Sequence, residues 1–194
     1  MAREGKAKVL TSEELKRLLI VVSNSSFKIR NIAMLYVSFG LGLRAKEIAA
    51  LTINDVADKN GKLLDVINLK SAMTKGNKQR HAYLVNKKVR QALHNHLDNL
   101  ESSKPNKPLF QTQRKSKFTP NALQKWFTKA YKAAGIIGAS SHSGRRTFIT
   151  RLIEKGVDIK AVSRLAGHAN IGTTAIYIED NPERLKRIAE IAIV

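Results

Sequence analysis

The sequence predicts a mainly α-helical domain with one small antiparallel β-sheet, an α+β fold. Apolar residues recur at helical spacing, between capping signals, on both sides of a central region. Only in that region, residues 63–85, does the spacing become that of strands. Because no internal repeat interrupts this order, we expect helices, then a hairpin, then helices again.

Three helices are expected near the N-terminus. Thr11 and Glu14 form a capping box, with the threonine as N-cap of the first helix. The second helix, residues 29–39, is almost wholly apolar and should therefore be central, with glycines at its end. A short third helix is expected at residues 44–51.

The hairpin and the later helices follow. Residues 63–69 and 81–85 have the composition of strands, and residues 74–78 contain a Gly-Asn pair suited to the turn between them. Further helices are expected at 88–100, at 119–134 with Pro120 in its first turn, and at 143–155, 158–166, 172–178 and 181–192.

The charge of the chain points to a polyanionic partner. Lysine and arginine total 35 against 15 acidic residues, a net charge of +20. Residues 102–153 contain no carboxylate at all, although lysines and arginines occur throughout them. These charges lie in several elements and not along one amphipathic stripe, which favours double-stranded nucleic acid over a membrane surface.

Several function classes are excluded by what the sequence lacks. It has no cysteine, so a disulfide framework, a zinc ribbon and a thiol nucleophile are excluded, and a cytoplasmic location is expected. No run of 18 apolar residues is present, and residues 1–8 lack the apolar stretch of a secretory signal. Because no metal-ligand spacing is found, we expect neither a metal nor another cofactor.

Two segments in the first half carry groups suited to phosphate chemistry. Arg44 directly follows the buried second helix, although a surface pairing with Glu47 or Glu14 would explain it equally well. Lys75 lies at the expected hairpin tip, where it could swing into a bound duplex, contact a phosphate or belong to a solvated turn.

Two more such segments lie in the second half. His142 and Arg145 share one face at the start of a helix, where free N–H groups can bind an anion. His168 follows Gly167 at a helix end, and Tyr177 comes nine residues later. A lone tyrosine is more often a half-buried packing residue, so Tyr177 would not stand out by itself.

Together these residues resemble the phage integrase, or tyrosine recombinase, family. That family has an Arg in a G-L-R-x-x-E segment, a Lys in a β-hairpin, a His-x-x-Arg, a Gly-His and a Tyr some nine residues later. This sequence shows them in order as Arg44, Lys75, His142, Arg145, His168 and Tyr177. Because six motifs occur in order along almost the whole chain, the fold implied is the tyrosine recombinase catalytic domain.

Two departures from the family pattern stand out. Gly144 replaces the apolar residue of the common H-x-L-R-H, which is expected to loosen the start of that helix. Only about ten residues precede Thr11, whereas family members usually carry an N-terminal helical domain that clamps DNA. The chain is therefore either an isolated catalytic fragment or a naturally short member, similar in length to recombinases of the fimbrial-switch type.

The resemblance implies a site-specific DNA recombinase that acts in integration, excision or inversion. Tyr177 would attack a phosphodiester and form a 3′-phosphotyrosine, which conserves the bond energy so that rejoining needs no ATP. The other implied roles are phosphate binding by Arg44, Arg145 and His168, proton transfer by Lys75 and His142, and support of Arg44 by Glu47. The implied partners are double-stranded DNA, a homotetramer assembled on it, and accessory DNA-bending proteins.

The chain divides into three expected parts. Residues 1–10 form a basic arm, residues 11–180 the catalytic domain, and residues 181–194 a tail helix. The tail either caps its own domain or is exchanged between protomers. Two further functions stay open, a type IB topoisomerase-like relaxing activity and a DNA-binding regulatory module without catalysis.

Overall fold

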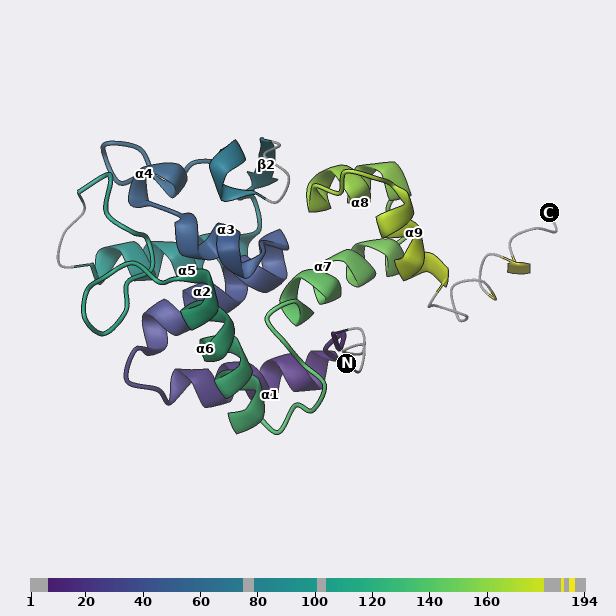
Figure 1. The fold of residues 1–194 in the computed structure, drawn as a ribbon, viewed down its shortest axis with the longest axis horizontal. Helices are drawn as coiled ribbons and strands as arrows, with labels where there is room; N and C mark the ends of the chain where they lie inside the picture. Colours follow the sequence, from purple (N-terminus) through teal and green to yellow (C-terminus); the bar gives the residue numbers. More distant parts are fainter. Residues whose placement is uncertain (1–6, 75–78, 101–103, 180–185, 187–188, 191–194) are drawn as a thin grey trace.

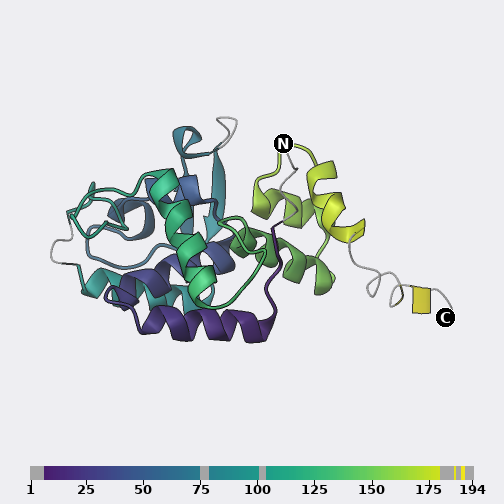
Figure 2. The ribbon, with the colours of Figure 1, turned by 60° about the horizontal axis from the view of Figure 1, so that its bottom comes forward.

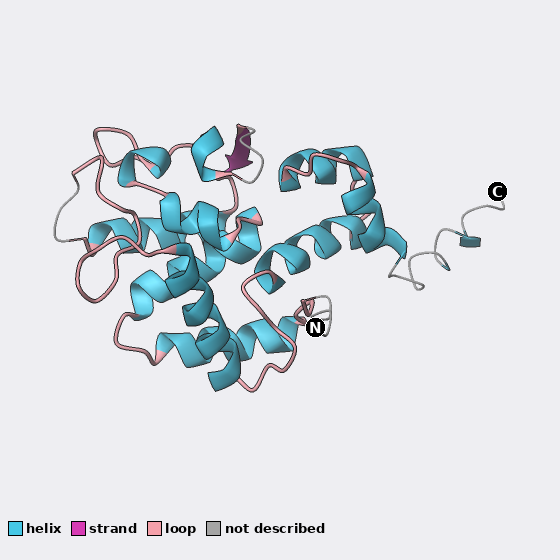
Figure 3. Cartoon of the chain, viewed as in Figure 1, coloured by secondary structure: helices cyan, strands magenta, loops and turns pink. Residues whose placement is uncertain are grey.

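The computed structural model describes residues 7–74, 79–100, 104–179, 186 and 189–190. Figures 1 and 3 show an assembly of helices with one small sheet, so the predicted fold class is confirmed. In chain order the elements are α1 (Ser12–Ser23), α2 (Lys28–Leu41), α3 (Ala45–Ala50), α4 (Ile53–Val56), β1 (Val66–Leu69), the 3-10 helix η1 (Ser71–Met73), β2 (Arg80–Tyr83), α5 (Lys87–Asp98), α6 (Pro120–Ala133), α7 (Ser143–Glu154), α8 (Ile159–Ala166) and α9 (Gly172–Glu179).

The predicted helix boundaries follow from local capping. The Thr11 hydroxyl accepts the Glu14 backbone N–H, and the Glu14 carboxylate accepts that of Thr11, so the capping box is confirmed. Helix α2 runs through Gly40 and ends at Gly42, whose φ of 62° is readily adopted by glycine. The sequence did not predict α4 or η1, because each is a single short turn without a full apolar period.

The two strands pair as an antiparallel hairpin. Val66 lies opposite Tyr83, and Leu69 lies opposite Arg80. Ile67, Leu69 and Ala82 are buried, and Arg80 lies on the same inward face of the hairpin as Ala82. The expected tip residue, Lys75, lies outside the described residues.

The helices enclose two apolar clusters of unequal size. The larger surrounds α2 and takes side chains from α1, α3, α5, α6 and the sheet. The smaller consists of Ile149, Ile153, Val162 and Ala166, with Tyr177 packed against it. In Figure 2, α7 leads from the main body to α8 and α9, so this helix joins the two clusters.

Gly144 lies where α7 packs closely against α2. A Cβ on Gly144 would lie 2.1 Å from Ser38 Oγ and 3.2 Å from Phe39 Cδ2. The expected loosening of the helix start is not seen, since α7 begins at Ser143 and Gly144 is buried. The glycine instead permits close helix packing.

The residues before α1 pack against the rest of the fold. Leu10 is buried, its backbone N–H donates to Thr147 Oγ1 over 2.9 Å, and that of Lys8 donates to the Gly138 carbonyl. The boundary between arm and domain at residue 10 stays a prediction, and most of the expected tail helix lies outside the described residues. None of the described helices has the length and apolar character needed to cross a membrane.

Candidate active site

Glu47 is a fully buried carboxylate that two arginines share. Arg44 donates its backbone N–H to Oε2 over 2.7 Å and its Nη1–H to Oε1 over 3.0 Å. Arg80 donates Nη2–H to Oε2 over 2.6 Å and Nε–H to Oε1 over 3.2 Å. Burial raises the pKa of Glu47, but the hydrogen bond and charge of Arg80, followed by those of Arg44, outweigh it and lower the pKa.

Arg44 occupies the N-cap position of α3, directly after the end of α2. Of its two predicted surface partners it contacts Glu47, whereas Glu14 pairs with Lys8. The Arg44 side chain keeps 22% of its surface exposed while Glu47 has none. Pairing with Glu47 therefore leaves part of Arg44 accessible to a further anion.

Arg145 lies in the first turn of α7 and is 5% exposed. Its Nη1–H donates to the Gly42 carbonyl over 2.9 Å, and its Nη2–H donates to the Ala166 carbonyl. These carbonyls stand at the C-terminal ends of α2 and α8, where helix dipoles favour a cation. Burial, followed by repulsion from Arg44 and Arg80, lowers the pKa of Arg145 to about 9, so it stays charged at neutral pH.

His168 follows the left-handed Gly167 at the end of α8. Its Nδ1 lies 2.7 Å from Oγ1 of Thr174, which is fully buried. Burial, followed by the charges of Arg145, Arg44 and Arg80, lowers the pKa of His168 to about 4. The imidazole is therefore neutral at pH 7, with Nδ1 held and Nε2 available for another partner.

Tyr177 lies on α9 beside His168. The two rings are nearly parallel, at 17°, with centroids 6.3 Å apart. The guanidinium of Arg146 lies 5.4 Å from the centroid of the tyrosine ring. Tyr177 is half-buried against the smaller apolar cluster, so the packing role considered from sequence is also present.

The structure thus brings four of the six predicted residues near one another, because Arg44 pairs with Glu47, the charges of Arg44 and Arg145 act on His168, and the Tyr177 ring lies beside that of His168. His142 is exposed at the N-cap of α7, three residues before Arg145. The sixth, Lys75, lies outside the described residues.

Arg80 was missed as a site residue. Sequence reasoning left it between the expected turn at 74–78 and the expected strand at 81–85, whereas it begins β2 and points inward with Ala82. An arginine at an inward position of a strand is the signal that could have found it, because a buried guanidinium needs a carboxylate partner.

The position of the Arg80 side chain requires a glycine at residue 167. Its φ is +65°, and a Cβ there would lie 2.2 Å from Arg80 Cδ and 2.9 Å from Nε, on a side chain fixed by Glu47. We expect Gly167→Ala to lower the free energy of unfolding by about 3 kcal/mol, through both conformational strain and overlap. Urea denaturation followed by circular dichroism would measure the loss.

Gly156→Ala is the matched control for that prediction. Gly156 also has a positive φ, 78°, but nothing lies within 4 Å of an added Cβ. Only the conformational cost of about 1 kcal/mol is expected there. Equal losses in the two variants would contradict the proposed overlap with Arg80.

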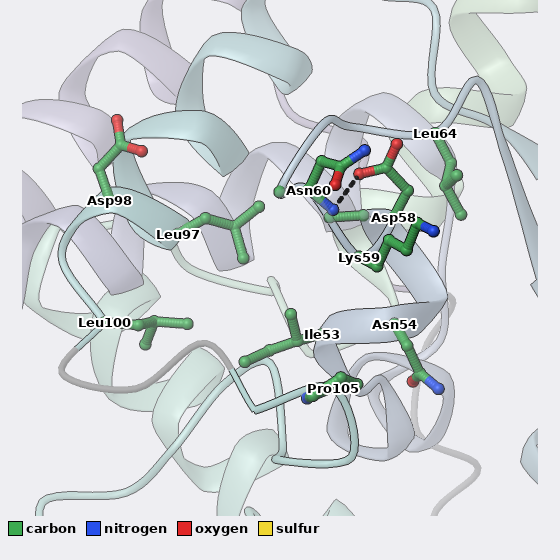
Figure 4. Close-up of a pocket in the computed structure, with 12 residues that line it drawn as sticks. Ile53, Asn54, Asp58, Lys59, Asn60, Leu64, Leu97, Asp98, Leu100 and Pro105 are labelled. Carbon is green, nitrogen blue, oxygen red and sulfur yellow. Dashed lines mark hydrogen bonds between the residues drawn. The ribbon is translucent and has the colours of Figure 1, made fainter.

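A separate hollow of about 620 Å³ lies between α4, the end of α5 and the adjoining loops. Figure 4 shows Ile53, Leu97, Leu100 and Pro105 along its apolar side, with Asp58 and Asn60 on the loop beside it. None of the predicted site residues lines it, so it is distinct from the candidate active site.

Comparisons with known proteins identify the family. The phage integrase family model matches residues 8–184. Tyrosine recombinase XerA of Thermococcus kodakarensis is 33% identical over 190 residues, which cover 95% of this chain and 62% of that protein. XerA of Pyrococcus horikoshii is 31% identical over 189 residues, with coverages of 95% and 61%. The chain therefore belongs to the phage integrase family, and these relatives are tyrosine recombinases.

Solved structures agree with this assignment. The crystal structure of XerA recombinase aligns with a TM-score of 0.77 and 28% identity, over 99% of this chain and 67% of that one. The catalytic domain of bacteriophage HP1 integrase, 21% identical, shares the fold with a TM-score of 0.67 over 96% of both chains. The present chain spans about three fifths of the length of the curated relatives named above.

Proposed function

We propose that this chain cleaves and rejoins double-stranded DNA through a covalent link to Tyr177, as the catalytic part of a site-specific recombinase. The observation that carries the proposal is that two fixed arginines, Arg44 and Arg145, act on a neutral histidine, His168, whose ring lies beside that of Tyr177. The two arginines and the histidine suit the two non-bridging oxygens of a phosphodiester, which share its negative charge. The tyrosine beside the histidine suits the nucleophile that attacks the phosphorus.

The proposed reaction begins with attack by the Tyr177 phenolic oxygen on phosphorus. The new O–P bond forms as the bond to the 5′-oxygen breaks, the phenolic proton leaves, and the 5′-oxygen takes up a proton. Arg44 and Arg145 would neutralise the charge that gathers on the non-bridging oxygens, and His168 would hydrogen-bond one of them through Nε2. Attack by a 5′-hydroxyl on the phosphotyrosine reverses the steps and rejoins a strand.

Proton transfer to the leaving oxygen is proposed for Lys75, with assistance from His142. The position of His142 at the start of α7, three residues from Arg145, supports its part in this assignment. The role proposed for Lys75 rests on its place in the sequence pattern alone, because this residue lies outside the part of the chain that the structure describes.

Double-stranded DNA is the proposed substrate. XerH, 26% identical to this chain, has been solved bound to its difH substrate before cleavage, with a TM-score of 0.68 over 96% of this chain and 54% of that one. The net charge of +20 fits the same ligand. Integration, excision or inversion, a tetramer on DNA with an exchanged tail helix, accessory DNA-bending proteins and a cytoplasmic location belong to the proposal as well.

Covalent trapping tests the reaction. The protein is mixed with a labelled library of nicked duplexes of randomised sequence, and adducts are separated on denaturing gels. We expect the wild-type chain to form a protein–DNA band that Tyr177→Phe lacks, because the nucleophilic oxygen is removed. Tyr83→Phe, which alters an exposed tyrosine on β2, should keep the band.

Three outcomes separate the alternatives. Absence of adduct from the wild type would favour a DNA-binding module without catalysis. An adduct that survives Tyr177→Phe would assign another nucleophile. Relaxation of a single supercoiled plasmid without recombinant products would favour a topoisomerase-like activity.

A further inference from the structure

Two guanidinium groups compete for one buried carboxylate in this site. Arg80 reaches both oxygens of Glu47 through Nε and Nη2 and is only 8% exposed. The Arg44 side chain reaches one oxygen through Nη1 and remains more exposed. Among the described residues, Glu47 is the only hydrogen-bond partner of the Arg44 guanidinium.

The Glu47 carboxylate neutralises the two arginines unequally. One carboxylate can neutralise one guanidinium, and the two-point contact of Arg80 is the stronger geometry for doing so. The trio of Arg44, Arg80 and Glu47 therefore keeps one net positive charge, which resides on Arg44, the more exposed of the two arginines. If Arg80 were absent, Arg44 would be the one residue of the described chain still hydrogen-bonded to the buried carboxylate.

Arg80 is also held independently of Glu47. Its Nη1–H donates to the Leu165 carbonyl over 3.1 Å, and the missing side chain of Gly167 leaves the space in which its Cδ lies. The guanidinium is thus fixed between the carboxylate and the C-terminal end of α8. Because Arg80 is fixed from both sides, it can remain paired with Glu47 and so limit the pairing of Glu47 with the Arg44 guanidinium.

We propose that Arg80 is a positioning residue that neutralises Glu47 and so keeps the charge of Arg44 available to the DNA phosphate. This inference rests on the proposed function, since the phosphate is the group that Arg44 would meet. Arg80 itself need not touch DNA. Its effect on cleavage passes through Glu47.

The test is a double-mutant cycle on the rate of adduct formation. The variants are Arg80→Met, Glu47→Gln and the two combined, assayed at saturating concentration of a nicked duplex recovered from the wild-type adduct. Arg80→Met should slow the reaction on the order of 100-fold, because the freed carboxylate captures Arg44. Adding Glu47→Gln removes that carboxylate and should restore the rate by about tenfold.

Two further variants separate positioning from folding. Arg80→Lys keeps a charge beside Glu47 and should retain most of the rate even if Arg80→Met fails to fold. Arg90→Met is the matched structural control, because Arg90 also pairs with a carboxylate, Asp65, and donates to backbone carbonyls, those of Leu63, Leu64 and Leu84, none of which belongs to the site. It should lower the urea midpoint without altering the adduct rate of the folded protein.

A substrate with a neutral phosphate analogue distinguishes a positioning role of Arg80 from a purely structural one. With a methylphosphonate at the scissile position the substrate carries no charge for Arg44 to neutralise, so the defect of Arg80→Met should shrink to about threefold. A double mutant slower than Arg80→Met, or an undiminished defect on the methylphosphonate, would overturn the inference alone. Absence of adduct from the wild-type chain would overturn the proposed function and the inference with it.

Discussion

Replacing Arg145 with alanine is expected to slow covalent adduct formation on the order of 1,000-fold. The guanidinium is held by the Gly42 and Ala166 carbonyls, so it would meet the proposed phosphate without reorganising. Donors fixed in this way are worth 10²–10³ in rate, and the loss of a whole charge should fall at the upper end. Single-turnover adduct formation on a nicked duplex measures the effect.

Arg151→Ala supplies the control for that substitution. Arg151 lies on the same helix, in its last turn, and contributes to none of the site contacts described above. Its replacement should leave the adduct rate within about threefold of wild type, because only a peripheral charge is lost. A comparable loss in both variants would mean that Arg145 acts through the general charge of α7.

Replacing Gly144 with leucine, the residue of the family pattern, is expected to lower the free energy of unfolding by about 4 kcal/mol or to prevent folding. Even the first added carbon would lie 2.1 Å from Ser38 Oγ and 3.0 Å from Ser38 Cβ. A well-packed helix interface cannot absorb this without moving α7 away from α2. The urea midpoint measures the loss.

A compensating pair tests the cause of that loss. Gly144→Ala alone should cost about 2 kcal/mol although alanine favours a helix, whereas Ser38→Gly with Gly144→Ala should recover most of it. The pair moves the side chain from α2 to α7 and relieves the overlap. No recovery in the pair would contradict close packing as the reason for the glycine.

Much of the fold could be predicted because its signals are local. The capping box at Thr11 and Pro120 at the start of α6 act within one turn of their helices, and the apolar run of α2 lies within that helix. The hairpin follows equally from composition over a few residues. These features depend on neighbours in sequence, which a sequence displays directly.

The candidate site was only partly accessible from the sequence. The residues with motifs, such as Arg145 and His168, could be proposed, but the arrangement that joins them could not. Arg80 reaches Glu47 across 33 residues and Leu165 across 85, and nothing in the local pattern records those contacts. The role of Gly144 was likewise hidden, because it depends on how closely α2 passes.

The two arginines that hold the end of α8 have a consequence for motion. Arg80, on β2, donates to the Leu165 carbonyl, and Arg145, at the start of α7, donates to the Ala166 carbonyl, so the two arginines fasten the C-terminal end of α8 to the main body. Beyond these two hydrogen bonds, α8 and α9 pack chiefly on α7 through the smaller apolar cluster, so this unit with Tyr177 has few links to the core around α2. Amide hydrogen exchange in α8 and α9 should accordingly be faster than in α2, and a phosphate that engages Arg145 would slow it, coupling DNA binding to the rigidity of the segment that carries the tyrosine.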